Sequence, residues 1–206
     1  MPHLLQPFYL VSSLNRDFAE EIHLVRTQRD VALKTAEIME IGINPLVGVT
    51  ADFWEHVEAT YVADGWRGLA AFRIEGPAAG MTPMENPLIS SQEMGIAVID
   101  APLSGNPEGP LYAVLMNRDF VESAAVFEDP AEVTPFLMET FSIDPRSIEN
   151  AEDLDRAITA SYAAGGWRGL VVARIDPRSL EHSLLDPSDA GLLALCKERS
   201  GTPAPV

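Results

Sequence analysis

Four arginines could bind an anion, because each stands in a short motif that occurs twice in the chain. Asn15-Arg16-Asp17 returns as Asn117-Arg118-Asp119, and Gly65-Trp66-Arg67-Gly68 returns as Gly166-Trp167-Arg168-Gly169. A guanidinium group suits a carboxylate or phosphate, which it holds through several donors in a fixed geometry. The sequence therefore indicates one ligand hypothesis, a small anion bound at paired sites where two halves of the chain meet, by Arg16, Arg67, Arg118 and Arg168.

Both motifs also have a structural explanation. Asn and Asp favour turns, since their side chains bond nearby backbone, and an arginine between them can pair with a carboxylate. In Gly-Trp-Arg-Gly, the first glycine ends a helix in the left-handed conformation and the tryptophan covers the helix end. The second glycine then lets another backbone approach closely. Neither motif has the spacing of a phosphate-binding loop, so we favour the structural explanation for both.

Carboxylates dominate the charged residues. The chain of 206 residues contains 31 Asp and Glu against 14 Lys and Arg, which gives a formal net charge of −17. This balance disfavours direct binding to nucleic acid or to an anionic membrane, because contacts to phosphates need Lys and Arg. Two explanations stay open, a solubilising or salt-adapted negative charge and a negative surface that meets a basic partner.

The negative charge concentrates in two tracts. Residues 35–66 contain six carboxylates and residues 119–145 contain seven, and neither tract contains a Lys or Arg. Both tracts fall on expected helices, whose exposed faces could imitate the phosphates of a duplex or bind a basic groove of another protein. The residues that we expect to contact such a partner lie off the apolar stripes of two helices: Glu55, Glu58, Asp153 and Asp155.

The remaining titratable residues indicate neither catalysis nor metal binding. The four histidines show no metal-ligand spacing, and the positions of Glu55, His56 and Glu58 do not converge on one ion. A single cysteine, Cys196, excludes an internal disulfide, and its apolar neighbours favour a buried structural thiol. The chain also lacks a dinucleotide fingerprint and a nucleophile elbow. We therefore lean against an enzyme and expect no cofactor and no metal.

Hydropathy and the N-terminus bear on location. No segment approaches the roughly 18 consecutive apolar residues of a membrane-spanning helix. The opening residues Met1-Pro2-His3 are not followed by the basic and apolar regions of a signal peptide. We expect a cytoplasmic protein without a membrane segment.

The chain repeats itself over most of its length. Residues 61–69 and 162–170 share seven of nine residues at a separation of 101 positions. Other short blocks also occur twice, in the same order along the chain and at offsets of 100 to 102. We predict a tandem duplication with units at 1–101 and 102–206, in which 76–110 includes the connecting loop. The two units are expected to pack with pseudo-twofold symmetry, each burying the apolar surface of the other. A single continuous sheet is the alternative.

Each unit is expected to fold as β-β-α-α-β, which makes the chain an α+β protein. Apolar runs between turn signals predict strands at 7–14, 21–27, 66–74, 111–116, 121–127 and 167–175, and less clearly at 95–99. The segment from Asn15 to Asp30 is three residues longer than the one from Asn117 to Asp129. That difference suggests an exposed hairpin that tolerates insertion.

Helices are expected after each strand pair and again before each Gly-Trp-Arg-Gly motif. Asp30 and Asp129 are the expected N-caps of the first helix in each half, with Pro130 at the first helical position. Thr50 and Asn150 are the expected N-caps of the second. Apolar stripes at helical spacing run through these second helices, Phe53, Val57 and Tyr61 in one and Leu154, Ile158 and Tyr162 in the other. A further helix is expected at 190–197.

These observations lead to one expected function and two alternatives. The leading expectation is a non-enzymatic acidic interaction protein that binds a basic protein surface. Its concrete form is a phage- or plasmid-encoded inhibitor of a nucleic-acid-binding defence machine. The first alternative is the protein that binds a small anion through paired arginines, and the second is an enzyme of unrecognised type.

Overall fold

The computed structural model describes residues 8–16, 19–43, 51–66, 68–75, 100–102, 109–118 and 121–199, and the account below concerns these residues. In chain order the elements are β1 (Phe8–Arg16), β2 (Ala19–Val25), α1 (Gln28–Ile38), α2 (Ala51–Ala63), β3 (Gly68–Glu75), β4 (Asp100–Pro102), β5 (Leu111–Arg118), β6 (Val121–Phe127), the 3-10 helix η2 (Pro130–Glu132), α3 (Val133–Thr140), the 3-10 helix η3 (Pro145–Ser147), α4 (Ala151–Ala164), β7 (Trp167–Asp176), β8 (Glu181–Leu185) and α5 (Ala190–Arg199).

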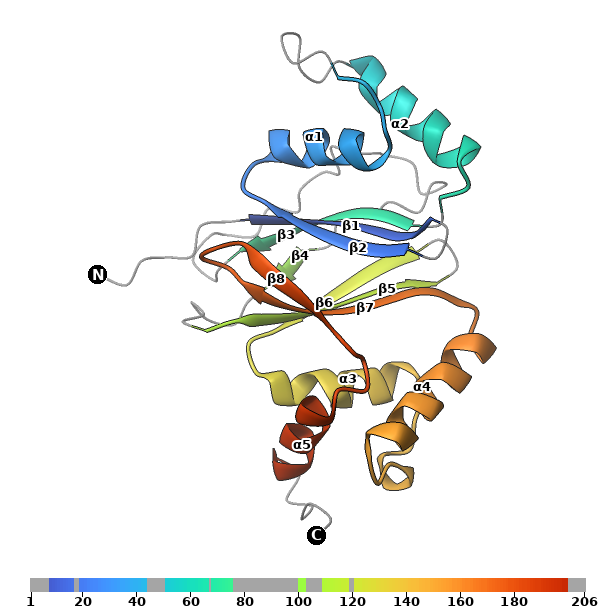
Figure 1. The fold of residues 1–206 in the computed structure, drawn as a ribbon, viewed down its shortest axis with the longest axis vertical. Coiled ribbons are helices and arrows are strands. Elements are labelled where there is room, and N and C mark those ends of the chain that lie inside the picture. The colour runs from blue at the N-terminus through green and yellow to red at the C-terminus, as the bar shows by residue number, and fades with distance from the viewer. Residues whose placement is uncertain are drawn as a thin grey trace, which may run out of the picture.

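The elements form four layers in the order helix, sheet, sheet, helix (Figure 1). One sheet has the strand order β2-β1-β3-β4 and is covered on its outer face by α1 and α2. The other has the order β6-β5-β7-β8 and is covered by α3, α4 and α5. All pairings are antiparallel except that of β3 with β4, which is parallel. The expected α+β class is confirmed, and the strands form two sheets rather than one continuous sheet.

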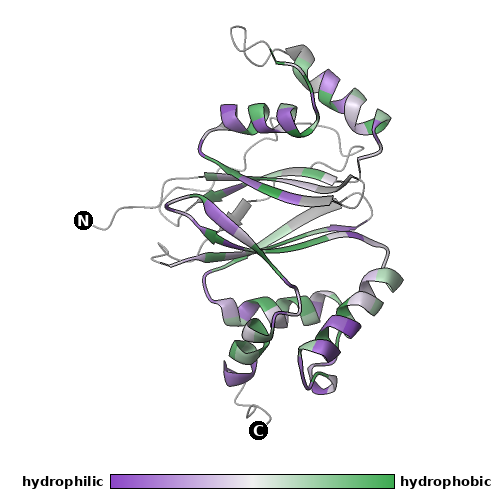
Figure 2. Ribbon diagram, viewed as in Figure 1, coloured by the Kyte–Doolittle hydropathy of each residue, from purple (hydrophilic) through white to green (hydrophobic). Residues whose placement is uncertain are grey.

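Hydrophobic side chains fill three cores between these layers. An inner core joins the two sheets and contains Phe8, Leu10, Ile22, Phe72, Ile74, Leu111, Ala113, Leu115, Val171, Ala173 and Ile175. Two outer cores join each sheet to its helices. The central strands are therefore buried on both faces, which explains why they read as continuous apolar runs. Hydrophilic residues lie mostly on the helices and at the hairpin ends (Figure 2).

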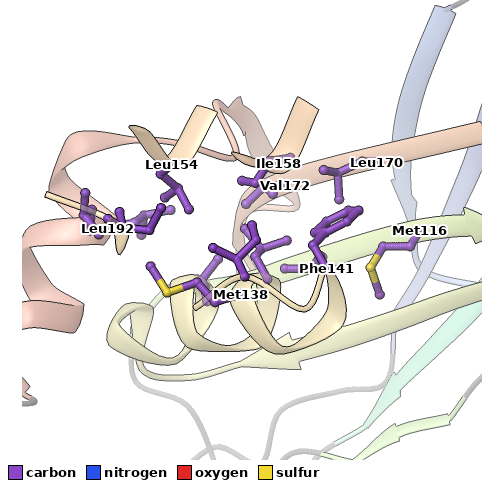
Figure 3. Packing of buried hydrophobic residues seen from close by; sticks show 14 residues of the cluster. Met116, Met138, Phe141, Leu154, Ile158, Leu170, Val172 and Leu192 are labelled. Atoms are coloured by element: carbon purple, nitrogen blue, oxygen red, sulfur yellow. The ribbon is translucent and has the colours of Figure 1, made fainter. Parts of the chain in front are cut away.

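The outer core of the second half draws side chains from five elements. Met138 and Phe141 come from the α3 segment, Leu154 and Ile158 from α4, and Leu192 from α5, and they point toward Leu170 and Val172 of β7 and Met116 of β5 (Figure 3). This convergence fixes α3, α4 and α5 relative to the sheet, because buried cores are close-packed.

The start of α1 corrects one expectation. Thr27, not Asp30, is the N-cap: Thr27 Oγ1 accepts a 3.1 Å hydrogen bond from Asp30 N, and Asp30 Oδ2 accepts one of 3.1 Å from Thr27 N. The two residues form a capping box, with Asp30 at its third helical position. With Thr27 as the counterpart of Asp129, the expected three-residue insertion disappears, and β2 and β6 are both seven residues long.

In the second half the expected cap of α4 is confirmed, whereas Asp129 caps a 3-10 turn and α3 starts only at Val133. Asp129 caps η2 by accepting a 2.9 Å hydrogen bond from Ala131 N, and Pro130 occupies the first position of that turn. Asn150 caps α4 by accepting a 3.0 Å hydrogen bond from Asp153 N. The expected cap Thr50 lies outside the described residues.

The two halves end their helices in the same way. Gly65 and Gly166 have φ angles of 69° and 70°, which confirms the expected left-handed glycines. Glu40 after α1 and Ser142 after α3 are also left-handed, with φ angles of 57° and 55°, although neither is a glycine. The stripe residues Phe53, Val57, Tyr61, Leu154 and Ile158 are buried, as expected. Tyr162 is only partly buried.

The C-terminal part adds one element that the sequence does not predict. The helix expected at 190–197 is confirmed as α5, whereas β8 was not expected. Asp176 Oδ1 accepts hydrogen bonds from Arg178 N and Ser179 N at 2.8 and 3.2 Å and so builds the turn between β7 and β8. The possible strand at 95–99 lies outside the described residues. None of the described helices has both the length and the apolar character needed to cross a bilayer.

Candidate functional site

The acidic residues expected to contact a partner are divided between the two outer layers. Glu55 and Glu58 are exposed on α2, and Asp155 is exposed on α4. These helices cover opposite sides of the sandwich (Figure 1). The structure therefore brings the two pairs to separate faces, and a flat partner surface could meet only one face at a time.

Asp153 differs from the other three because it has a structural role. Its Oδ2 accepts a 3.3 Å hydrogen bond from Glu149 N, and its Oδ1 lies 3.4 Å from Arg156 Nη1. It stands in the first turn of α4, where a carboxylate also interacts favourably with the helix dipole. Reversing its charge would therefore disturb the helix end, which makes Asp153 unsuitable as a probe of binding alone.

The two repeated motifs meet in the second half. Asn117 on β5 pairs with Gly169 on β7, and after a register shift Arg118 pairs with Trp167. The Arg118 guanidinium carbon lies 5.5 Å from the Trp167 ring centroid, within cation–π distance. The other motif arginine of this half, Arg168, is partly buried on β7. Sequence reasoning singled out both motifs but did not foresee that they are cross-strand neighbours.

Trp167 faces the helical layer. It packs against the outer core of the second half, and its ring centroid lies 5.1 Å from that of Phe141. Arg118 thus stacks on the α3 side of its sheet rather than between the sheets. Arg67 and the side chain of Arg16 lie outside the described residues, so the expected four-arginine set can be placed only in its second half.

A surface pocket of about 410 Å³ lies where α3 and α5 meet. We call it the α3–α5 pocket. Almost all of its surface is apolar, and it opens to solvent between η2, α3, the α3–η3 connection and α5. Its lining residues are Ala131, Pro135, Met138, Glu139, Ile143, Pro145, Cys196 and Arg199. Because they come from two segments more than fifty positions apart, no local sequence pattern could have revealed this site.

Charged side chains surround the α3–α5 pocket. Arg199 Nη1 lies 2.9 Å from Asp129 Oδ2 and 3.1 Å from Glu132 Oε1, so one cation is shared by two carboxylates. Lys197 Nζ donates a 2.7 Å hydrogen bond to the carbonyl oxygen of Glu149. Glu139 is exposed at the pocket itself. The pocket is therefore an apolar depression lined by one carboxylate, Glu139, and one guanidinium, Arg199, which is itself paired with Asp129 and Glu132.

Two histidines approach each other where the sheets meet at one edge. Burial lowers the pKa of His182 on β8 below its ordinary value, and the charge of His23 on β2 lowers it further. Arg26 at the end of β2 donates a 2.7 Å hydrogen bond to the carbonyl oxygen of Arg178, which links the halves at this edge. Within the described ranges, no group of three or more His, Cys, Asp and Glu side chains is arranged to hold a metal ion.

Comparison of the chain with protein-family models, with curated proteins and with solved structures gives no match. The functional argument therefore depends on the residues of the chain itself. Among the described surfaces, the acidic outer helices and the α3–α5 pocket offer the clearest binding features.

Proposed function

We propose that this chain is a non-enzymatic acidic interaction protein that binds a basic surface on another protein. The observation that carries this proposal is how the exposed charges are distributed. Glu55, Glu58 and Asp155 stand exposed on the outer helices. Two basic side chains of the same layers are held by neighbouring carboxylates, Lys34 by Glu37 at 2.6 Å and Arg156 by Glu152 at 3.1 Å. The excess carboxylates therefore set the sign of the outer surface.

The concrete form of this proposal is an inhibitor that occupies a groove built for nucleic acid. Such a groove carries Lys and Arg that contact phosphates, and an acidic helical surface can engage the same side chains. A phage- or plasmid-encoded antagonist of a defence machine would be a protein of this kind. The net charge of −17 supports the proposal because it favours rapid, charge-steered association with a basic partner.

We also propose that the chain arose by tandem duplication, with units at 1–101 and 102–206 related by a pseudo-twofold axis. The repeated sequence blocks support this proposal. So do the shared sheet orders, in which β1 and β5 are flanked by β2 and β3 or by β6 and β7. The left-handed residues Glu40 and Ser142, and Gly65 and Gly166, stand at offsets of 102 and 101. The proposed symmetry would give each half an outer acidic helix.

The arginine-based alternative has less support. A guanidinium that stacks on an aromatic ring beside an outer helix, as Arg118 does on Trp167, is not directed at a site between the sheets. We therefore do not assign an anion site to the junction of the halves.

The proposed function can be tested by charge reversal. A partner is captured from cells of the source organism with the unaltered chain, purified, and titrated against variants at low and high salt. Glu55→Lys with Glu58→Lys tests one face, and Asp155→Lys tests the other. Asp153 is kept because its carboxylate holds the backbone of Glu149 at the start of α4. We expect at least one face to lose affinity by about tenfold at low salt, and the loss to shrink at high salt because screening weakens exposed charges.

A matched control keeps the change in net charge the same. Glu181→Lys with Glu21→Lys matches the double reversal, and Glu181→Lys alone matches Asp155→Lys; both residues are exposed on edge strands, outside α2, α4 and the α3–α5 pocket. Circular dichroism should show that all variants remain folded. If neither the salt concentration nor any of the reversals changes the affinity for the partner, the proposal is contradicted, and the negative charge serves solubility alone.

A further inference from the structure

We propose that the α3–α5 pocket receives a bulky apolar side chain from a basic helical segment of the partner protein. The inference rests on the proposed function and deepens it, because it names the place and the chemistry of recognition. Lys or Arg residues that flank the apolar anchor would lie near Glu139 and near the Asp129 and Glu132 carboxylates that pair with Arg199. The anchor would supply affinity and the flanking charges would supply orientation.

The shape and lining of the pocket favour a side chain over an enclosed small molecule. The floor is formed by the buried residues Ala131, Met138 and Ile143, whereas Pro135 and Pro145 stand exposed at its mouth. Small-molecule sites usually enclose most of their ligand. A depression that opens widely between helices instead resembles the grooves that accept one face of an amphipathic helix. Methionine at the floor adds adaptability, because its thioether side chain fills irregular spaces.

The charges at the rim favour a basic rather than an acidic or neutral segment. Arg199 compensates only part of the charge of Asp129 and Glu132, since one guanidinium faces two carboxylates. Glu139 adds a further exposed carboxylate at the pocket. Together these groups set three carboxylates against one guanidinium, so the rim repels an acidic segment, attracts a basic one and gives no added binding to a segment without charge. A second copy of this chain is disfavoured as the occupant for the same reason, because its own helices are acidic.

The single cysteine provides the means to test the proposal. Cys196 lines the pocket and is partly exposed, so a maleimide attached to it would fill the space that the anchor needs. The probe is a fluorescent amphipathic peptide of Leu and Lys, and its binding to the full chain is followed by anisotropy. A peptide of Ala and Lys keeps the charge and removes the anchor. A peptide of Leu and Glu keeps the anchor and reverses the charge.

We expect the Leu/Lys peptide to bind more tightly than either comparison peptide. Alkylation of Cys196 should weaken its binding by about tenfold, to the level of the Ala/Lys peptide, which is the loss expected of a central anchor. Cys196→Ser, treated with the same reagent, should bind as the untreated chain does. Glu139→Lys should weaken Leu/Lys binding severalfold, whereas the matched reversal Glu58→Lys on the opposite layer should leave the anchor-dependent difference between peptides unchanged.

Several outcomes would overturn the inference. Leu/Lys binding that persists after alkylation, or Leu/Glu binding of equal strength, would show that the pocket does not select a basic segment. Self-association of the unmodified chain that alkylation abolishes, measured by sedimentation, would show that a second copy fills the pocket. The two proposals fail in different ways. If binding depends on salt but is unchanged by alkylation of Cys196, this inference is wrong and the proposed function stands. If binding is lost on alkylation but does not depend on salt, both are wrong.

Discussion

Two adjacent glycines at the end of α4 are needed for different physical reasons, and separate substitutions should show this. Gly166 has a φ of 70°, and an added Cβ would meet nothing within 4 Å. Gly165 has an ordinary φ of −85°, but an added Cβ would lie 2.8 Å from Trp167 Cδ1 and Nε1 and 2.9 Å from the Ser161 carbonyl oxygen. Alanine at Gly166 would therefore strain the backbone, and alanine at Gly165 would collide with a side chain.

The expected magnitudes follow from these two causes. Gly166→Ala should lower the free energy of unfolding by about 1–2 kcal/mol, the cost of a left-handed conformation for a residue with a Cβ. Gly166→Asn should cost less, because Asn tolerates that region. Gly165→Ala should cost about 1–3 kcal/mol, as overpacking usually does. The Trp167 ring cannot easily move aside, since Phe141 and Arg118 both contact it.

A double-mutant cycle with Trp167→Ala separates the two mechanisms. Free energies of unfolding are measured by urea denaturation with far-UV circular dichroism. In the Trp167→Ala background, Gly165→Ala should lose much of its cost, apart from the part caused by the Ser161 carbonyl, so the two changes should couple by about 1 kcal/mol. Gly166→Ala should cost the same in both backgrounds to within about 0.5 kcal/mol. Equal coupling in the two cycles, or a neutral Gly165→Ala, would refute the reasoning.

Three further predictions concern caps, cores and titration. Asn150→Ala should lower the free energy of unfolding by about 1 kcal/mol through loss of the α4 cap, whereas Glu149→Ala, which keeps the backbone donor, should change it little in the same urea experiment. Trp66→Ala should cost about 3–5 kcal/mol because the side chain is 7% exposed in the outer core, and a loss below about 1 kcal/mol would contradict that packing. Because the pKa of His182 is lowered, the unfolded chain binds more protons than the folded one, so stability should fall as the pH drops below about 6.5. His182→Asn should flatten that slope in urea midpoints measured across this range, and parallel curves for the two proteins would count against the assignment.

Local sequence signals gave most of the elements, and the errors have identifiable causes. Strands and helices with strong periodicity were found where expected. The cap of α1 was misplaced because Thr27 and Asp30 are both good caps, and only the capping box shows which of them starts the helix. β8 was missed because its residues are largely exposed and polar, as is usual at a sheet edge. A strand of this kind is defined by its partner β7 and by the turn at Asp176, not by its own pattern.

The site was harder to predict than the fold. The exposure of Glu55, Glu58 and Asp155 agrees with their position off the apolar stripes, but helical periodicity does not reveal that Asp153 is bonded to the backbone of Glu149. The stack of Arg118 on Trp167 depends on a strand register that includes a shift. The α3–α5 pocket depends on how α5 docks, which is a matter of tertiary packing. Sequence patterns show which face of a helix or strand is buried, but they do not show which other elements pack against that face.

The repeated motifs themselves explain the fold better than the function. Gly-Trp-Arg-Gly is identical in both halves, yet Asp64 stands where the second half has Gly165, so only the second tryptophan needs a neighbour without a Cβ. A motif that is kept while its surroundings change is one that the helix-to-strand turn requires. Features that specify a partner should instead lie where the halves differ. The α3–α5 pocket has this property, because α5 has no counterpart among the described elements of the first half. This difference directs the search for a binding function to α5 and the pocket beside it.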